Sequence, residues 1–503
     1  MKKKAIFHNI VGGLSNFAFV FFTSIFLLPY YLKFITNDDY GVWLGGISFI
    51  SLASIFEANL SLILTQELAK KLVDKKLLEF SKYLTAAIFF SVCSGVIITL
   101  GIYCFKENIF YLVSENVTNI ALFTTSFFLY SISLSLTIIT GYLGSVFQVY
   151  LITIKQPWYS IIASLVGVLC TVMLVSSYGV LSLAIGYLVK SMVYLIFIAT
   201  GASKILKANN IGLIFRLKYV GKLLKSIGLP FISKLMMTSA MNIQNFIISV
   251  TIGSSITTIY DITRKLPLIN ISLINIIAMG TFTSFSLFYS EVNDKLIRDD
   301  YTKKYFDFIR VLLFVSMTTI FLIGKDFIRL WVGLDKFAGV GMLALICACC
   351  LLDQLRMLLA QQYYSTGKIN VTSITDSTYA ILFGISVITI LPSMGLKGIV
   401  LAGIISNLLY FVVCKYVEVK SKMDIVSQII TKALVLDIIV VSFISFISYS
   451  VISLYPENIF VTLIVTVTSL IILLIIYFNK EKLLISFIFS QFLKPFDQGK
   501  RGL

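Results

Sequence analysis

Long apolar blocks separated by short polar segments run along the whole chain. A helix needs about 20 apolar residues to cross about 30 Å of hydrocarbon, whereas a transmembrane barrel shows alternation in segments of about ten. The pattern therefore predicts an all-α polytopic membrane protein with about 14 transmembrane helices. The predicted spans are residues 10–32, 41–64, 83–104, 119–151, 159–176, 180–201, 227–250, 257–289, 305–324, 338–360, 371–391, 397–414, 430–453 and 459–478.

The composition excludes a soluble globular protein. Of the 503 residues 58% are apolar and only 13% are charged, and the mean hydropathy is +0.95. A soluble chain carries roughly twice this share of charged residues, because it must cover its surface with polar groups.

Positive charge is concentrated on one side of the predicted membrane topology. The chain holds 41 Lys and Arg against 24 Asp and Glu, a net charge of +17. With the N-terminus in the cytoplasm, the inside segments hold 28 of these cations and the outside loops hold 6. This bias predicts cytoplasmic termini, and it accounts for most of the excess charge without nucleic acid.

Six helices return a chain to the same side of the membrane, so a parallel repeat of two pseudo-symmetric six-helix lobes is expected. The predicted organisation is an N-terminal lobe (residues 1–201), a basic amphipathic cytoplasmic linker (202–226), a C-terminal lobe (227–414) and two additional helices with a basic tail (415–503). The cations and apolar residues of the linker are typical of a helix that lies on anionic lipid.

Polar residues form stripes on the first and seventh predicted helices. One stripe is Asn9, Asn16, Thr23 and Tyr30, and the other is Lys234, Thr238, Asn242, Asn245 and Ser249. In two related lobes such stripes would border a central cavity. Small polar residues also join helices in dry contacts, and this alternative stays open for each single residue.

Charged residues inside the spans are candidate functional groups. A cation at mid-bilayer costs about 2.5–3.5 kcal/mol on the insertion scale, so it must face protein or water. Asp353 and Arg356 are expected to pair at i,i+3. The charged residues with less obvious partners are four cations, Lys190, Lys234, Arg264 and Lys265, and two acids, Glu57 and Asp261. Their net positive charge predicts a cavity that accepts an anion, whereas a cavity for cationic drugs would carry the opposite sign.

The acidic members of this set have more than one possible partner. Asp261 can pair with Lys265 at i+4 or Arg264 at i+3 but cannot neutralise both. Glu57 can pair with a lysine of another helix. We therefore expect Glu57 and Asp261 to act as ion-pair or coupling residues.

The sequence lacks the residue motifs of most catalytic and metal-binding sites. His8 is the only histidine, and nearly all of the seven cysteines lie in apolar blocks. There is no phosphate-binding GxxxxGK[ST] loop, no HExxH and no GxSxG. We expect a transporter without a metal or cofactor, although a membrane polymerase or transferase stays an alternative.

Two short motifs resemble a known family. Residues 32–43 read Leu-Lys-Phe-Ile-Thr-Asn-Asp-Asp-Tyr-Gly-Val-Trp, and residues 56–69 read Phe-Glu-Ala-Asn-Leu-Ser-Leu-Ile-Leu-Thr-Gln-Glu-Leu-Ala. This is similar to the polysaccharide-transporter family of Wzx-type O-antigen flippases, within the multidrug/oligosaccharidyl-lipid/polysaccharide exporter superfamily. Thr36, Asn59 and Gln66 depart from the usual residues, and Glu57 matches an acidic position.

The resemblance implies alternating access around a central cleft, and a cargo of undecaprenyl-diphosphate-linked oligosaccharide that moves from the cytoplasmic to the outer leaflet of a bacterial inner membrane. It implies a role in O-antigen or lipopolysaccharide biosynthesis, with an ion, proton or cargo gradient as driving force. Further partners would be membrane lipid, a polysaccharide polymerase and chain-length machinery. The expected binding residues are Lys190, Lys234, Arg264, Lys265, Asn242, Asn245 and Asn16. A multidrug antiporter of the same fold is the main competing hypothesis.

Overall fold

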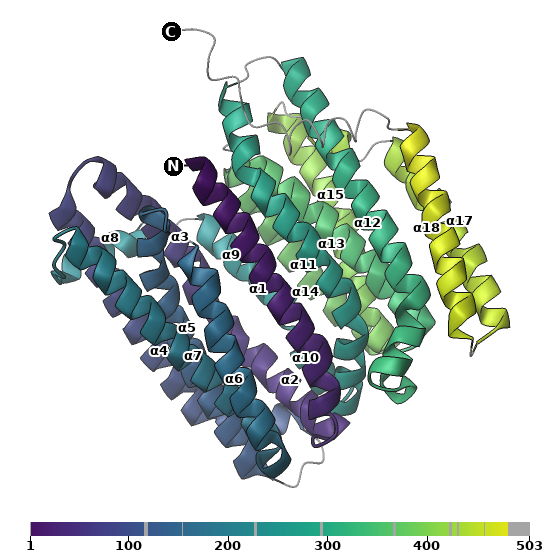
Figure 1. Ribbon diagram of the computed structural model, residues 1–503, viewed down its shortest axis with the longest axis horizontal. Helices are drawn as coiled ribbons and strands as arrows, with labels where there is room; N and C mark the ends of the chain where they lie inside the picture. Colours follow the sequence, from purple (N-terminus) through teal and green to yellow (C-terminus); the bar gives the residue numbers. More distant parts are fainter. Residues whose placement is uncertain are drawn as a thin grey trace. The chain divides into compact units, whose positions relative to one another are not determined.

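The computed structural model describes residues 2–114, 119–152, 154–225, 229–291, 295–365, 369–421, 425–429, 432–456 and 458–480. Over these residues the chain is helical and contains no strand, which confirms the predicted all-α class (Figure 1). Each predicted span lies on one helix or on two successive helices. Ten of the described helices are long and apolar enough to cross a membrane, and Ser15–Tyr31 is a shorter apolar helix. The chain is a multi-pass membrane protein.

The helix bounds place the predicted spans in chain order. The earlier elements are α1 (Lys2–Tyr31), α2 (Asn37–Ser51), η1 (Leu52–Ser54), α3 (Ile55–Val73), α4 (Leu77–Val113), α5 (Ile120–Val149), α6 (Lys155–Tyr178), α7 (Val180–Ala208), α8 (Leu217–Lys225), α9 (Leu229–Asn242) and α10 (Gln244–Thr251). The later elements are α11 (Ser254–Glu291), α12 (Lys295–Trp331), η2 (Leu334–Lys336), α13 (Val340–Ser365), α14 (Ile369–Met394), α15 (Leu396–Ser421), α16 (Val426–Ile429), α17 (Lys432–Leu454) and α18 (Ile459–Lys480).

The chain divides into two compact units. Unit 1 comprises Met1–Lys265, Trp331–Ala338 and Gly367–Tyr410, and unit 2 comprises Leu266–Leu330, Gly339–Thr366 and Phe411–Leu503. The border falls within α11, directly after Lys265. The lobe boundaries given above from the sequence stay a prediction.

Small residues bring the helices of unit 1 close together. A Cβ added to Gly167 of α6 would lie 2.7 Å from the carbonyl oxygen of Gly186 of α7, and α6 and α7 pack side by side (Figure 1). The Ser135 hydroxyl of α5 donates to the Gly95 carbonyl of α4 over 2.8 Å. Such close backbone approach stabilises helix pairs in lipid, where the hydrophobic effect does not drive association.

Two glycines make very short helix connections in unit 1. Gly179, at φ +50°, is the only residue between α6 and α7, and Gly395, at φ +55°, is the only residue between α14 and α15. A positive φ suits glycine because it has no Cβ. The two turns join the fifth to the sixth and the eleventh to the twelfth predicted span, as a six-helix repeat would require.

The second and seventh predicted spans are interrupted, which corrects the expectation of two continuous helices. The 3-10 turn η1 separates α2 from α3, and a bend at Ile243 separates α9 from α10. The Ser48 hydroxyl donates to the Asn242 carbonyl at the end of α9. This contact satisfies a backbone acceptor at the interruption, as membrane-embedded chains require.

The start of α2 packs against the start of α11. The Thr36 hydroxyl caps α2 by accepting from the Asp39 amide over 3.1 Å. The Asp38 carboxylate accepts from the hydroxyls of Ser254 and Ser255, where a negative charge also complements the helix dipole. Gly41 allows this approach, because a Cβ there would lie 1.8 Å from the Ser254 carbonyl oxygen. Part of the motif that carries the family resemblance thus serves a helix junction.

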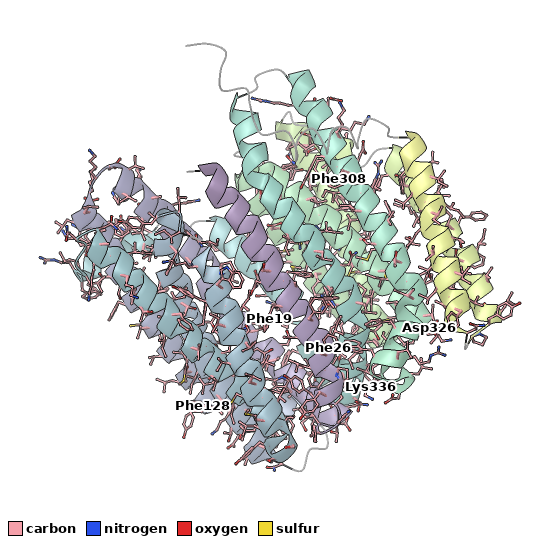
Figure 2. The ribbon with its side chains drawn as sticks, viewed as in Figure 1. Phe19, Phe26, Phe128, Phe308, Asp326 and Lys336 are labelled. Carbon is pink, nitrogen blue, oxygen red and sulfur yellow. The ribbon has the colours of Figure 1, made fainter. Side chains whose placement is uncertain are left out.

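In unit 2, buried charges attach the last two helices to α12. The Arg310 guanidinium lies 2.7 Å from Asp307 and 2.9 Å from Asp437 of α17. Near the other end of α12, Asp326 accepts from the Thr462 hydroxyl of α18 over 2.6 Å (Figure 2). On α13, Asp353 and Arg356 lie 3.2 Å apart, and this pair was expected from the sequence.

Candidate functional site

A cavity of about 250 Å³ lies within unit 1. Side chains of α1, α2, α6, α7 and the first turns of α11 line it. They are Val20, Thr23, Ser24, Leu27, Leu28, Tyr31, Tyr40, Trp43, Ser164, Gly167, Val168, Thr171, Leu183, Gly186, Tyr187, Lys190 and Lys265. Two of these residues are cationic and none is acidic, so the wall of the cavity is electropositive.

Lys190 enters the cavity from the middle of α7. The Cβ atom of Lys190 packs on Gly167. A Cβ atom added to Gly167 would lie 2.8 Å from the Cβ atom of Lys190. Within the described residues the Lys190 ammonium has no hydrogen-bond or ion-pair partner. A cation that is desolvated without a partner is costly, and an anionic ligand in the cavity would remove that cost.

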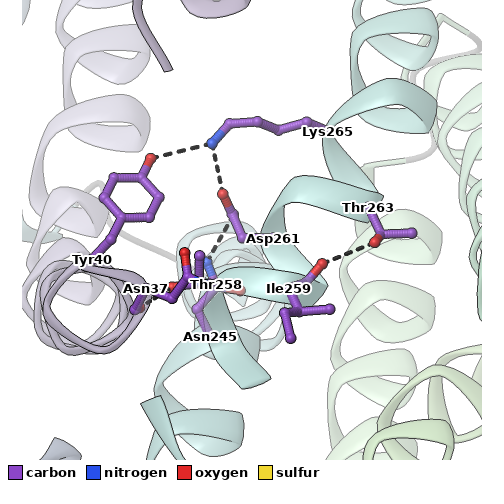
Figure 3. A network of polar contacts seen from close by, with 8 residues as sticks. All are labelled: Asn37, Tyr40, Asn245, Thr258, Ile259, Asp261, Thr263 and Lys265. Carbon is purple, nitrogen blue, oxygen red and sulfur yellow. Dashed lines mark hydrogen bonds and ion pairs between the residues drawn. The ribbon is translucent and has the colours of Figure 1, made fainter. Parts of the chain in front are cut away.

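Lys265 reaches the same cavity from α11 and is held by two partners (Figure 3). Its ammonium lies 2.7 Å from the Asp261 carboxylate and donates to the Tyr40 hydroxyl over 3.3 Å. The ammonium also lies 5.6 Å from the centre of the Tyr40 ring. The i,i+4 pair with Lys265 is one of the two pairings of Asp261 that the sequence left open.

Asp261 has a further partner that fixes its position. The Asn245 amide of α10 donates to the Asp261 carboxylate over 3.1 Å (Figure 3). Nearby on the same helices, the Tyr260 hydroxyl donates to the Gln244 side chain over 2.9 Å. Two successive residues of α10 therefore anchor the start of α11, and the Asn245 amide faces Asp261.

Aromatic rings form one side of the cavity. Tyr187 lies 6.3 Å from Trp43 between ring centres and 5.4 Å from Tyr130 of α5. Trp43 is only 2% exposed, whereas Tyr187 is 43% exposed and presents an open surface. An open ring with hydroxyl groups nearby suits a sugar, whose apolar face can stack while its hydroxyls form hydrogen bonds.

The structure brings some of the predicted site residues together and leaves others apart. Lys190 and Lys265 share the cavity, and Asp261 and Asn245 support Lys265. Arg264 is not among the lining residues, and its guanidinium lies 5.8 Å from the Tyr260 ring. The functional roles of all these residues stay predictions.

The remaining candidates lie on α1, α3 and α9. Asn16 is half-buried on α1, one turn before the lining residue Val20. The Asn242 side chain is exposed, and it is the backbone carbonyl of this residue that contacts Ser48. The side chains of Glu57 and Lys234 lie outside the described residues. In the described part of the chain no group of three or more His, Cys, Asp or Glu could hold a metal ion.

Sequence reasoning missed the aromatic wall and the glycines below Lys190. Tyr31, Trp43 and Tyr187 lie in apolar blocks, where aromatic residues more often pack against helices or lipid. The sequence did contain a signal for this packing. Gly167 and Thr171 on α6 are four residues apart, and so are Gly186 and Lys190 on α7. Small residues opposite a lysine leave room for its side chain.

The chain matches a family model described as "Polysaccharide biosynthesis protein" over residues 33–335. No curated protein matches it in sequence. Among solved structures it is similar to a lipid II flippase MurJ in an inward closed conformation, with a TM-score of 0.69 and 15% identity, covering 95% of this chain and 98% of that chain.

Two further solved structures share the fold. One is an inward-facing multidrug resistance MATE transporter of the MOP superfamily, with a TM-score of 0.58, 16% identity, and coverage of 83% of this chain and 94% of that chain. The other is a MOP superfamily transporter from Pyrococcus furiosus described as having a binding pocket of reverse polarity, with a TM-score of 0.58, 14% identity, and coverage of 85% and 97%. These three similarities show that the chain shares the fold of the three structures.

Proposed function

Because the chain belongs to the polysaccharide biosynthesis protein family, we propose that it carries a lipid-linked oligosaccharide across the membrane. The cargo is an undecaprenyl-diphosphate-linked repeat unit of O-antigen or a related surface polysaccharide. The protein moves it from the cytoplasmic to the outer leaflet of a bacterial inner membrane by alternating access. The fold that the chain shares with a lipid II flippase supports a lipid-linked cargo.

The observation that carries this proposal is the position of Lys190 in a cavity whose lining has no acidic residue. A phosphate or an acidic sugar would supply the missing negative charge. Lysine binds phosphate as a point charge, and such charge-assisted contacts are stronger than neutral hydrogen bonds. The hydroxyls of Thr23, Ser24 and Ser164 and the open ring of Tyr187 complete a surface suited to a glycan.

The cavity volume limits what this conformation can hold. Pockets for drug-sized ligands measure about 300–1,000 Å³. At about 250 Å³ the cavity holds one sugar-sized or phosphate-sized group, and the rest of a repeat unit would extend beyond it. Alternating access therefore includes an opening step, and the polyprenyl tail stays in lipid.

The contacts of Lys265 suggest how opening is controlled. Asp261 pairs with Lys265, and an incoming anion would compete with Asp261 for the ammonium. An ion or proton that binds Asp261 would have a similar effect, so this pair is our candidate for coupling to a gradient. Binding energy would then shift the population between closed and open states.

A multidrug antiporter is the competing function, because MATE transporters share the fold. A cationic drug needs embedded carboxylates, and the lining of the unit 1 cavity offers instead the ammonium of Lys190 and that of Lys265, which is paired with Asp261. This difference in sign favours the anionic cargo. Drug resistance that disappears on deletion of the protein, with normal surface glycan, would favour the antiporter.

Reconstitution tests the proposal directly. The full chain is placed in liposomes with a fluorescent polyprenyl-diphosphate oligosaccharide, and a membrane-impermeant quencher reports how much label lies outside. Active protein exposes inner-leaflet label to the quencher faster than protein-free liposomes do. A rate equal to that of protein-free liposomes, in a sample whose folding is verified by its melting transition, would refute transport of this cargo.

A further inference from the structure

A second surface of unit 1, formed by residues that do not line the cavity, is rich in exposed cations and exposed apolar side chains. Residues 70–82 and 202–225 hold eleven Lys or Arg and two acidic residues. The acidic residues are already paired, since Glu79 lies 2.7 Å from Lys71 and Asp74 lies 3.7 Å from Lys76. The surface therefore keeps a large net positive charge.

The short helix α8 is fixed on this surface by an apolar anchor. Leu223 is fully buried and packs in a hydrophobic cluster with Phe80 and Tyr83 of α4. The preceding segment is also held on α4, because the Ser81 hydroxyl donates to the Gly212 carbonyl and accepts from the Ile214 amide. Because both attachments are to α4, the position of α8 along the axis of α4 is fixed.

The sequence of α4 shows where that position lies in a bilayer. Between Lys82 and Lys106 the helix has no charged residue. At 1.5 Å per residue this stretch is about 35 Å long, close to the hydrocarbon thickness of about 30 Å. Lys82 therefore marks one edge of the hydrocarbon, and its ammonium lies 5.7 Å from the centre of the Tyr219 ring of α8. The helix α8 lies at the level of lipid headgroups.

The segment before α8 reaches slightly deeper. The Phe215 ring lies 4.7 Å from that of Phe89, two turns of α4 beyond Lys82 and thus about 10 Å further in. Leu213 of this segment and Leu217, the first residue of α8, are 59% and 65% exposed. Interfacial segments bury their apolar side chains about 5–10 Å into the boundary between headgroups and acyl chains, so these residues are placed to contact lipid.

The cations of α8, with Arg216 directly before it, lie where lipid phosphates would be. Arg216, Lys218, Lys222 and Lys225 are all exposed, and Lys218, Lys222 and Lys225 follow the i, i+4, i+7 spacing of one helix face. We propose that α8 and residues 212–216 form a docking surface for anionic phospholipid, with the apolar segment in the acyl region and the α8 cations on lipid phosphates. This surface is separate from the cargo cavity and acts whatever cargo is carried.

The test compares two triple variants of the full chain with the same loss of charge. The first is Arg216→Gln, Lys218→Gln and Lys225→Gln, which keeps the Leu223 anchor and the contact of Lys222 with Tyr219, 4.6 Å from its ring centre. The second is Lys33→Gln, Lys106→Gln and Lys397→Gln, which removes three cations from the α1–α2 loop, from α4 and from the start of α15. Each protein is purified in maltoside micelles doped with dioleoylphosphatidylglycerol or dioleoylphosphatidylcholine.

The readout is the melting temperature as a function of lipid fraction. For the unaltered chain the anionic lipid raises the melting temperature more than the neutral lipid does, and high salt weakens the difference. Each juxtamembrane cation contributes appreciably to anionic-lipid affinity, so the α8 triple variant needs about a hundredfold more anionic lipid for half of the rise.

The comparison of the two triple variants shows whether anionic lipid binds at α8 or responds only to the total charge of the protein. We expect the second triple variant to keep the full rise in melting temperature with anionic lipid. In lipid-free micelles, both variants should melt at the same temperature as the unaltered chain. Equal responses to the two lipids, an unchanged response in the α8 variant, or equal losses in both variants would overturn the proposal.

Discussion

Lys265 and Asp261 form an ion pair at 2.7 Å, one helical turn apart, at the edge of a cavity that also receives Lys190. The pair makes the two cavity lysines unequal. One ammonium is neutralised within the protein, while the other has no partner among the described residues. An anionic cargo group would meet Lys190 first and could then compete for Lys265.

Replacement of Asp261 by Asn should tighten cargo binding and slow transport. The change leaves the Lys265 charge uncompensated, so the cavity attracts anions more strongly but releases them less readily. The side chains of Lys265 and Asp261 are 24% and 17% exposed. Loss of the pair should therefore lower the free energy of unfolding by roughly 1–3 kcal/mol, between surface and fully buried pairs.

Asp335→Asn is the matched control, because Asp335 pairs with Lys336 at 2.8 Å while its side chain is 64% exposed. Melting curves and the half-saturating cargo concentration in liposomes provide the measurements. An Asp261→Asn protein with unchanged affinity and rate would show that the pair has only a structural role.

Removal of the Lys190 charge should abolish most transport without unfolding the protein. Hydrogen bonds to a charged group contribute about 1.5–3 kcal/mol, so Lys190→Ala should lower the transport rate at low cargo concentration by about ten- to a hundredfold. Lys190→Arg keeps the charge and should restore part of the rate. Lys33→Ala, at an exposed lysine between α1 and α2, is the control for charge loss. Wild-type surface glycan in cells expressing Lys190→Ala at a normal level would remove Lys190 from the site.

The ring of Tyr187 should matter more than its hydroxyl. If the ring stacks on a sugar, Tyr187→Phe retains cargo affinity, while Tyr187→Ala loses about 0.5–1.5 kcal/mol, equal to about two- to twelvefold in half-saturating concentration. Both variants are compared in the same liposome assay. The opposite order, with a large loss in Tyr187→Phe, would mean that the hydroxyl binds the cargo and that stacking is not the interaction.

A methyl group at Gly41 should disrupt the contact between α2 and α11. Its Cβ would lie 1.8 Å from the Ser254 carbonyl oxygen, so the two helices must separate. Overpacking of this kind costs about 1–3 kcal/mol. Gly101→Ala in α4 is the control, because nothing lies within 4 Å of a Cβ there and alanine favours the helix. Gly41→Ala should melt at a lower temperature than the unaltered chain and Gly101→Ala should not. Equal melting of the two variants would contradict the close contact.

Hydropathy predicted the helical class and the fourteen apolar spans, because the length and apolarity of a membrane helix are local properties. It did not predict the interruptions at residues 52–54 and 243, since the residues on both sides of each remain apolar. Only the partner helix, through contacts such as that of Ser48 with Asn242, makes an interruption tolerable. The polar stripe expected along the seventh span crosses this interruption, because Asn242 lies on α9 and Asn245 lies on α10.

Charge counting identified both lysines of the cavity, because a cation in an apolar block is rare whatever the fold. It could not distinguish Asn245, which supports Asp261, from a residue that faces an open cavity. That distinction depends on which helix lies opposite. The aromatic wall was missed because tyrosine and tryptophan in a membrane helix can face protein, lipid or ligand equally well.

The most direct test of the account is the location of lipid-linked repeat units in cells that lack the protein. Intact spheroplasts of a depletion strain are treated with an impermeant glycan-modifying reagent before and after permeabilisation. We predict that undecaprenyl-diphosphate-linked units accumulate and react only after permeabilisation, since they remain in the cytoplasmic leaflet. Accumulated units that react in intact spheroplasts would contradict a flippase, because the cargo would then have crossed the membrane without this protein.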